Sequence, residues 1–283
     1  MLCRIGEVEV WRILEIDAPF LAPEEMFPGA GRHVGRIIAE KMPGGLCPAT
    51  GRVMLPIQGF LLKTPGHVIL VDTCVGNHKT APSFPDWHQR DTPRFLSALG
   101  AAGVGVEDID YVLCTHLHVD HVGWNTRLLD GRWVPTFPNA RYLLPQADEA
   151  FYAEKAKGMY DESLLPVFEA GQAELVEGAH GIGDHVTLMP TPGHTGGHVS
   201  VRVHGGGAEA VITGDAIHTA AQCWHPEWHF TFDQDAERAV LSRRALLEHA
   251  AERDARVLGT HFRLPSLGRV RVEGDAFAFL EDD

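Results

Sequence analysis

The sequence has no long apolar segment, few cysteines and no excess of basic residues. None of its stretches approaches the roughly 20 consecutive apolar residues that a membrane-spanning helix needs. Its five cysteines are odd in number and form no Cys-x-x-Cys pair, which indicates reduced thiols rather than a disulfide framework or a thiolate zinc site. The N-terminal residues 1–14 alternate apolar and polar side chains, as a strand does, and do not resemble a signal peptide. We therefore expect a cytoplasmic protein that does not enter a membrane.

Acidic side chains outnumber basic ones. The 283 residues include 24 Lys and Arg and 38 Asp and Glu, for a net charge of −14. A surface this acidic gains nothing from counter-ion release at a phosphate backbone, so nucleic acid is excluded as a partner. A small-molecule substrate is the remaining expectation.

The order of the patterns predicts an α/β protein with two mixed β-sheets flanked by helices. Beta-rich runs occur in both halves of the chain, helical patterns lie between them, and no repeat or linker separates the halves, so we expect one domain over residues 1–283. Strands are predicted at 7–16, 109–116, 140–145, 185–194, 198–204, 209–215 and 256–261, with two more inside 53–73, and helices at 91–103, 146–156 and 233–254.

Residues 17–50 are rich in proline and glycine and predict a long irregular excursion. Loops of this length are usually functional, so the segment is a candidate lid or homodimer contact, although an ordinary surface loop explains it equally well.

The segment THLHVDHVGWN, residues 115–125, contains four potential metal ligands within six positions. His116 and His118 project the same way if the backbone is extended, because side chains repeat with period two. Asp120 and His121 follow where the chain is expected to turn. One segment can therefore supply two adjacent metal ions. A solvated polar loop is the alternative, which so dense a cluster disfavours.

Three later β-rich runs also end in a potential ligand, namely His194, Asp215 and His261. Each alone is more often structural. Together with the cluster they give seven nitrogen and oxygen donors, enough for two ions with Asp215 as a bridging carboxylate.

These motifs resemble the metallo-β-lactamase superfamily. HLHVDH matches its H-x-H-x-D-H signature, and TPGHTGGH, TGD and GTH follow in the right order over roughly residues 53–262. The resemblance implies an αββα sandwich with a dinuclear centre. It assigns His116, His118 and His194 to the first metal and Asp120, His121 and His261 to the second, with Asp215 between them. An aspartate at position 215 is unlike true β-lactamases of the superfamily and points away from antibiotic hydrolysis.

Two divalent metal ions are therefore the expected cofactors, with zinc favoured and cobalt, manganese or iron also compatible with these donors. Ions about 3.5–4 Å apart share a water and depress its pKa, which gives a bridging hydroxide nucleophile. Asp120 is expected to orient that hydroxide or pass a proton.

His218 is a second candidate catalytic residue. N-acyl homoserine lactone lactonases carry a tyrosine at the similar position, so the histidine departs from that branch. The segments GDAIHTAAQ and THFRLPSLGRV resemble the methyl parathion hydrolase branch more closely. It could donate to an oxyanion or protonate a leaving group, and a structural role is equally compatible.

Aromatic residues near the motifs are candidates for a substrate pocket or a subunit interface. They are Trp124, Trp224, Trp228 and Phe230.

The leading expectation is a dinuclear hydrolase of esters, foremost lactones and including N-acyl homoserine lactones. Phosphotriester or aryl-ester hydrolysis of the methyl parathion hydrolase type is the alternative, because the same hydroxide attacks carbon or phosphorus. Thiolester hydrolysis and non-hydrolytic iron chemistry on this fold are less favoured.

Overall fold

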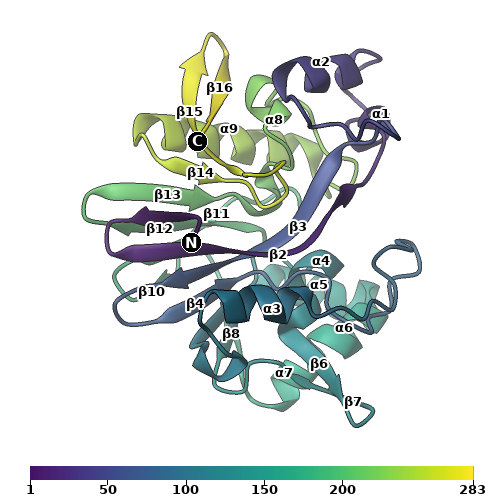
Figure 1. Ribbon diagram of the computed structural model, residues 1–283, viewed down its shortest axis with the longest axis vertical. Coiled ribbons are helices and arrows are strands. Elements are labelled where there is room, and N and C mark those ends of the chain that lie inside the picture. Colours follow the sequence, from purple (N-terminus) through teal and green to yellow (C-terminus); the bar gives the residue numbers. More distant parts are fainter. Residues whose placement is uncertain (283) are drawn as a thin grey trace. The chain divides into compact units, whose positions relative to one another are not determined.

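The computed structural model describes residues 1–282 (Figure 1). The chain divides into two compact units, each with its own strands and helices. The first unit combines Met1–Glu15 with Ile57–His185, and the second combines Ile16–Pro56 with the described residues from Val186 onward. Among the described residues, no helix is both long and apolar enough to cross a membrane.

The sheet of the first unit is mixed and has the order β1-β2-β3-β4-β5-β8-β9. Strands β4, β5, β8 and β9 pair in parallel, with β9 at the edge of the sheet, while β3 and β4 form an antiparallel hairpin. Parallel strands are usually covered on both faces, which explains why β4, β5 and β8 are short, apolar and nearly fully buried. The strands of this unit are β1 (Cys3–Ile5), β2 (Val8–Pro19, which continues into the second unit), β3 (Met54–Lys63, which begins in the second unit), β4 (Val68–Val71), β5 (Tyr111–Leu113), β6 (Thr126–Leu129), β7 (Arg132–Pro135), β8 (Arg141–Pro145), β9 (Ala173–Val176) and β10 (Gly181–Ile182).

Helices flank this sheet, and α5 packs on β8 and β9 (Figure 1). They are α3 (Arg94–Ala101), η1 (Val106–Asp108), α4 (Val119–Val122), η2 (Gly123–Asn125), α5 (Gln146–Lys155), α6 (Lys157–Ser163) and α7 (Leu165–Glu169).

The second unit contains six strands in the order β11-β12-β13-β14-β15-β16 and the long helix α9, which contacts β15. In Figure 1 these strands run from green to yellow. The elements of this unit are α1 (Pro23–Met26), α2 (Val34–Lys41), β11 (Val186–Pro190), β12 (Val199–Gly205), β13 (Ala208–Ile212), η3 (Gly214–Ala216), α8 (Ala221–Trp224), α9 (Ala236–Glu252), β14 (Arg256–Leu258), β15 (Leu267–Glu273) and β16 (Ala276–Glu281).

Strand direction explains why potential ligands gather at one edge in each unit. Both β11 and β13 run antiparallel to β12, and β14 runs parallel to β13, so these three strands point the same way. His194, Asp215 and His261 follow their carboxyl ends. In the first unit, β4 and β5 are parallel, so the residues that follow them also meet at one edge.

The predicted elements are found with three corrections. Segment 17–50 is not wholly irregular, because it contains the end of β2 and helices α1 and α2, and Pro23 occupies the start of α1, where proline is compatible with a helix. Helix α3 is shorter than the predicted range 91–103, because it begins at Arg94 and Pro93 is its N-cap residue. The hairpins β6–β7 and β15–β16 were not predicted.

Candidate metal centre

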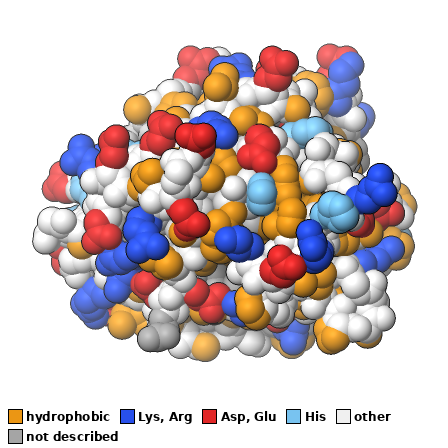
Figure 2. Space-filling view, turned by 90° about the horizontal axis from the view of Figure 1, so that it is seen from above, with side chains coloured by type: hydrophobic (Ala, Val, Ile, Leu, Met, Phe, Trp, Pro, Cys, Tyr) orange, Lys and Arg blue, Asp and Glu red, His pale blue; other side chains and the backbone are white. Residues whose placement is uncertain are grey.

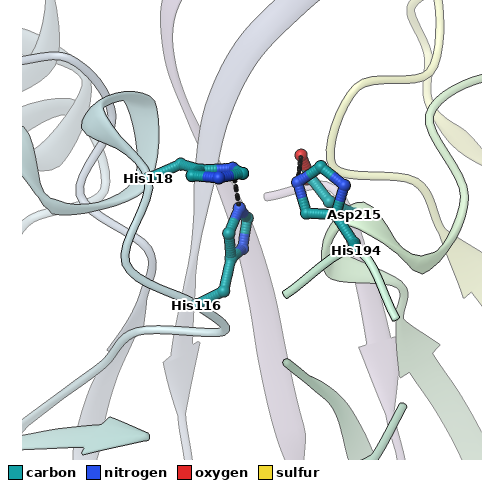
Figure 3. Close-up of side chains that lie close together, drawn as sticks. All are labelled: His116, His118, His194 and Asp215. Carbon is teal, nitrogen blue, oxygen red and sulfur yellow. Dashed lines mark hydrogen bonds and ion pairs between the residues drawn. The ribbon is translucent and has the colours of Figure 1, made fainter. Parts of the chain in front are cut away.

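In the first unit, the chain leaves β5 and places His116 and His118 on the loop that leads into α4. The two rings meet edge to face with centroids 4.6 Å apart. His116 Nε2 lies 2.9 Å from His118 Nδ1, as the dashed line in Figure 3 marks. Asp120 and His121 lie on the single turn of α4, and the His121 ring is 4.0 Å from that of His116. The structure therefore brings these four predicted ligands together within the unit.

Asp72, which follows β4, orients two of these histidines. One of its oxygens lies 3.0 Å from His121 Nδ1 and also accepts the hydroxyl proton of Thr115, while the other accepts the Thr115 backbone N–H. Because the Thr115 hydroxyl donates to Asp72, it must accept at 3.1 Å from His116 Nδ1. His116 then carries its proton on Nδ1 and presents the lone pair of Nε2 toward His118.

A close backbone approach fixes the turn after the cluster. Gly123 donates its N–H to the carbonyl of Cys74 at 2.7 Å. A Cβ added at Gly123 would lie 1.8 Å from the carbonyl oxygen of Val75, so no other residue fits here without moving the backbone.

In the second unit, three imidazoles surround the carboxylate of Asp215. His194 Nε2 lies 3.3 Å and His218 Nε2 3.1 Å from Oδ2, and His261 Nε2 lies 3.1 Å from Oδ1. All four side chains are buried. Figure 3 shows His194 beside Asp215.

Outer partners fix the tautomers of these histidines. His194 Nδ1 lies 2.9 Å from Asp233 Oδ1, and His261 Nδ1 lies 2.8 Å from the carbonyl oxygen of Pro56. Both partners only accept, so each ring is protonated on Nδ1 and turns the lone pair of Nε2 toward Asp215. Each Nε2 lone pair is repelled by the Asp215 carboxylate that it faces, and a cation bound between them would remove that repulsion.

Asp233 is held in turn by Arg243, the largest fully buried side chain. Their charged groups are 3.7 Å apart and wholly inaccessible to solvent. Arg243 donates to the backbone carbonyls of Ala216, Pro226 and Trp228 at 2.6–2.9 Å. Burial raises the pKa of Asp233, opposed by Arg243, and burial lowers the pKa of Arg243 to about 10, opposed by Asp233.

His218 is buried and stacks on Phe230 with ring centroids 3.6 Å apart. Burial lowers its pKa, and the Asp215 carboxylate opposes that shift. Its Nδ1 has no hydrogen-bond partner among the described residues. The ring is therefore a buried imidazole with one uncommitted nitrogen.

His198 supports the backbone at Asp215. Its Nε2 accepts the backbone N–H of Asp215 at 2.8 Å, and its Nδ1 faces Thr191. Cys114 is buried, and burial raises the pKa of its thiol.

The aromatic residues predicted to line a pocket have different surroundings. Trp124 is buried, stacks on Phe95 and donates its indole N–H to Glu15, so its placement gives no support to a pocket role. Trp228 and Phe230 are also buried and both pack against Phe27. Trp224 is half-buried and lines a cavity of about 320 Å³.

The seven predicted ligands carry the donor types that bind divalent metals. Four of the histidines have Nδ1 occupied by an outer partner and Nε2 left over, as metal-binding histidines usually do. The residues present therefore fit a metal cofactor. The outer partners Asp72, Asp233 and Arg243 were not predicted from the sequence. Of these, only Asp72, which ends an apolar run as Asp215 does, carried a recognisable signal.

A family model described as the metallo-beta-lactamase superfamily matches residues 54–261. An N-acyl homoserine lactonase of Bacillus sp is 29% identical over 161 residues, which cover 53% of this chain and 58% of the relative. Metallo-beta-lactamase domain-containing protein 1 of Xenopus laevis is 31% identical over 229 residues, covering 79% of this chain and 78% of the relative. The chain thus spans little more than half the length of the lactonase.

Solved structures with the same fold include AidC, described as a dizinc quorum-quenching lactonase in complex with a product, at 21% identity and a TM-score of 0.81. Another is the hydrolase AbOPH of the beta lactamase superfamily, at 22% identity and a TM-score of 0.83. Each alignment covers 99% of this chain and 96% of the other. These likenesses confirm the fold expected from the sequence. With a family model that covers most of its length, the chain belongs to the metallo-β-lactamase superfamily.

Proposed function

We propose that the chain is a metal-dependent hydrolase that uses two divalent ions to cleave ester bonds, foremost those of lactones. His116, His118 and His194 are assigned to one ion and Asp120, His121 and His261 to the other, with Asp215 bridging. The observation that carries the proposal is the set of outer partners, which leaves the Nε2 of His194 and His261 directed at the Asp215 carboxylate. Bound divalent ions lower the pKa of coordinated water and polarise the bond to be cleaved, which is the chemistry this centre would supply.

The protein's own residues hold and orient the ligands. Asp72 fixes the tautomer of His121 directly and that of His116 through Thr115. Asp233 does the same for His194. We assign Asp120 to orienting the attacking water in addition to binding metal.

His218 is assigned to the leaving group or the developing oxyanion. Its Nε2 is 3.1 Å from Asp215, and its ring is held by stacking on Phe230. Because burial lowers its pKa, the neutral imidazole predominates at neutral pH. It therefore stabilises the developing negative charge by a hydrogen bond and not by a full positive charge.

Lactones are favoured over other esters because several relatives that match this chain are named N-acyl homoserine lactonases. A small-molecule substrate and a cytoplasmic location also belong to the proposal, and they rest on the acidic net charge and on five cysteines that form no Cys-x-x-Cys pair. Zinc is the proposed metal, since the donors are imidazole and carboxylate. A homodimer, with segment 17–50 as a contact or lid, stays a prediction.

Phosphotriester or aryl-ester hydrolysis is the second candidate. The observation that favours it is the identity of residue 218, a histidine with an uncommitted nitrogen rather than a hydroxyl-bearing side chain. An imidazole at this position can stabilise a phenolate leaving group by a hydrogen bond from its N–H.

The test is parallel turnover of N-acyl homoserine lactones, aryl esters and phosphotriesters by metal-stripped protein reconstituted with zinc, cobalt or manganese. Lactone turnover well above that of the other two classes is expected, together with about two metal equivalents per chain. Turnover of phosphotriesters alone would favour the second candidate, and no metal-dependent turnover of any class would refute the proposal. An Asp215→Asn variant serves as the control for contaminating hydrolases.

A further inference from the structure

The second unit contains a cavity that none of the seven proposed metal ligands lines. Its volume is about 320 Å³, within the size range of small-molecule pockets. It is formed by α2, α8 and β16 with the segment that follows β14, and those elements lie together at the top of Figure 1. The lining residues are Lys41, Met42, Pro43, Ala220, Trp224, Phe262, Arg263, Phe279 and Glu281.

The walls of this cavity are aromatic and apolar. Phe262 and Phe279 meet edge to face with centroids 5.2 Å apart, and Phe262 is fully buried. Met42 is also buried, and its sulfur accepts a hydrogen bond from Thr219 at 3.5 Å. Aromatic walls of this kind favour a ligand with a flat or apolar body.

The charges at the cavity are unequal. Arg263 forms an ion pair with Glu281, so those two charges largely cancel. Lys41 has no carboxylate partner among the described residues, and its ammonium lies 5.4 Å from the centre of the Trp224 ring. That distance is within the range of a cation–π contact, which positions the ammonium beside the aromatic wall. The cavity therefore offers one uncompensated positive charge next to apolar surface.

The Lys41 ammonium lies on a protein that has no general excess of positive charge. Figure 2 views the molecule from the top of Figure 1, and basic, acidic and apolar side chains are interspersed on that face. The chain as a whole carries a net charge of −14. A general attraction of anions to the protein surface is therefore absent, and an anion would be held only by a local group.

We propose that this cavity binds a carboxylate with an apolar or aromatic body, with the body against Trp224 and Phe279 and the carboxylate at Lys41. This site is separate from the proposed metal ligands. It is nevertheless connected to them in sequence, because Ala220 follows His218 by two residues and Phe262 directly follows His261. Ester hydrolysis releases a carboxylate, so the cavity has the chemistry to hold a product of the proposed reaction, although its binding does not depend on that reaction.

Calorimetric titration of the purified protein with 4-phenylbutyrate and with its uncharged amide tests the proposal. The acid should bind about twofold to fivefold more tightly than the amide, the effect of one exposed charge pair. Lys41→Met should reduce binding of the acid to the level of the amide. Arg36→Met is the matched control, because Arg36 lies on the same helix, pairs with Glu40 and does not line the cavity, so it should bind the acid as the wild type does.

Trp224→Ala should weaken binding of both ligands, since it removes a wall. The titrations are repeated after metal removal by chelation, which separates this site from the proposed function. Equal affinity for acid and amide, binding unaffected by Lys41→Met, or binding that disappears with the metal would each overturn the proposal. Hydrolysis need not occur for any of these results.

Discussion

The buried pair of Asp233 and Arg243 gives the sharpest test of how the ligands are held. Asp233→Asn keeps the size of the side chain and an oxygen that can accept from His194, but removes the only carboxylate that the structure pairs with the Arg243 guanidinium among the described residues. Removing one partner of a buried ion pair costs about 3–5 kcal/mol, because the other charge is left uncompensated. Arg243 keeps its hydrogen bonds to three backbone carbonyls, and its distance to Asp233 is 3.7 Å, so we expect the lower end of that range, about 3 kcal/mol.

Thermal unfolding of metal-stripped protein measures this loss, which should lower Tm on the order of 6–10 °C. Metal affinity, measured by competition with a chromophoric chelator, should fall by about 10-fold to 100-fold, because the outer partner of His194 is weakened. Asp161→Asn, which removes a partly exposed carboxylate paired with Lys157, is the control and should change Tm little.

A double variant separates charge from shape. Asp233→Asn combined with Arg243→Met removes both charges, and its loss of stability should be smaller than the sum of the two single losses. Additive losses, or an Asp233→Asn protein with wild-type Tm and metal affinity, would show that the pair does not position His194.

Three further predictions concern other parts of the molecule. His218→Ala should lower kcat by about 10²–10⁴ with metal content unchanged, as determined by elemental analysis, and wild-type turnover would assign the residue to structure alone. Gly123→Ala should unfold at a lower temperature than Gly131→Ala, because a Cβ at 123 would meet the Val75 carbonyl whereas no atom is near a Cβ at 131. Both glycines lie in the first unit, but only Gly131 has a positive φ. A larger loss of stability at 131 than at 123 would therefore contradict the packing argument. Burial lowers the pKa of Lys79 to about 7, from an ordinary value near 10.5, so the unfolded chain binds more protons than the folded chain between those pH values. The wild type should therefore gain stability over Lys79→Met as the pH rises from 7 to 9, by at most about 1.4 kcal/mol per pH unit, as measured by urea unfolding. A pH-independent difference in stability would exclude a neutral buried amine.

Much of the fold could be predicted because the strands of both sheets end in recognisable residues. A strand lies within each apolar run before His116, His194, Asp215 and His261. Buried strands need continuous apolar side chains, so the polar ligand marks the point where the strand has ended. Hairpins β6–β7 and β15–β16 escaped prediction because they carry mixed residues, with Leu128 and Val272 exposed, and so lack a clean alternation.

The outer partners of the ligands could be predicted less well. Arg243 lies on α9 in a run of charged residues that is typical of a solvated helix face, and only tertiary packing buries it. Trp124 looked like a pocket wall because it follows the ligand cluster, but its indole N–H is satisfied by Glu15 in the interior, where burial raises the pKa of that carboxyl. Sequence order reports which groups are near in the chain, whereas hydrogen-bond partners come from distant segments.

One support among these differs in kind from the rest. The imidazole of His261 is steadied by the main-chain oxygen of Pro56, 205 positions away, whereas His121 and His194 depend on the carboxylates of Asp72 and Asp233. A point mutation can delete a carboxylate but leaves a peptide oxygen in place. A single substitution can therefore remove the hydrogen-bond partner of His121 or His194. His261 loses its partner only when the backbone of β3 moves.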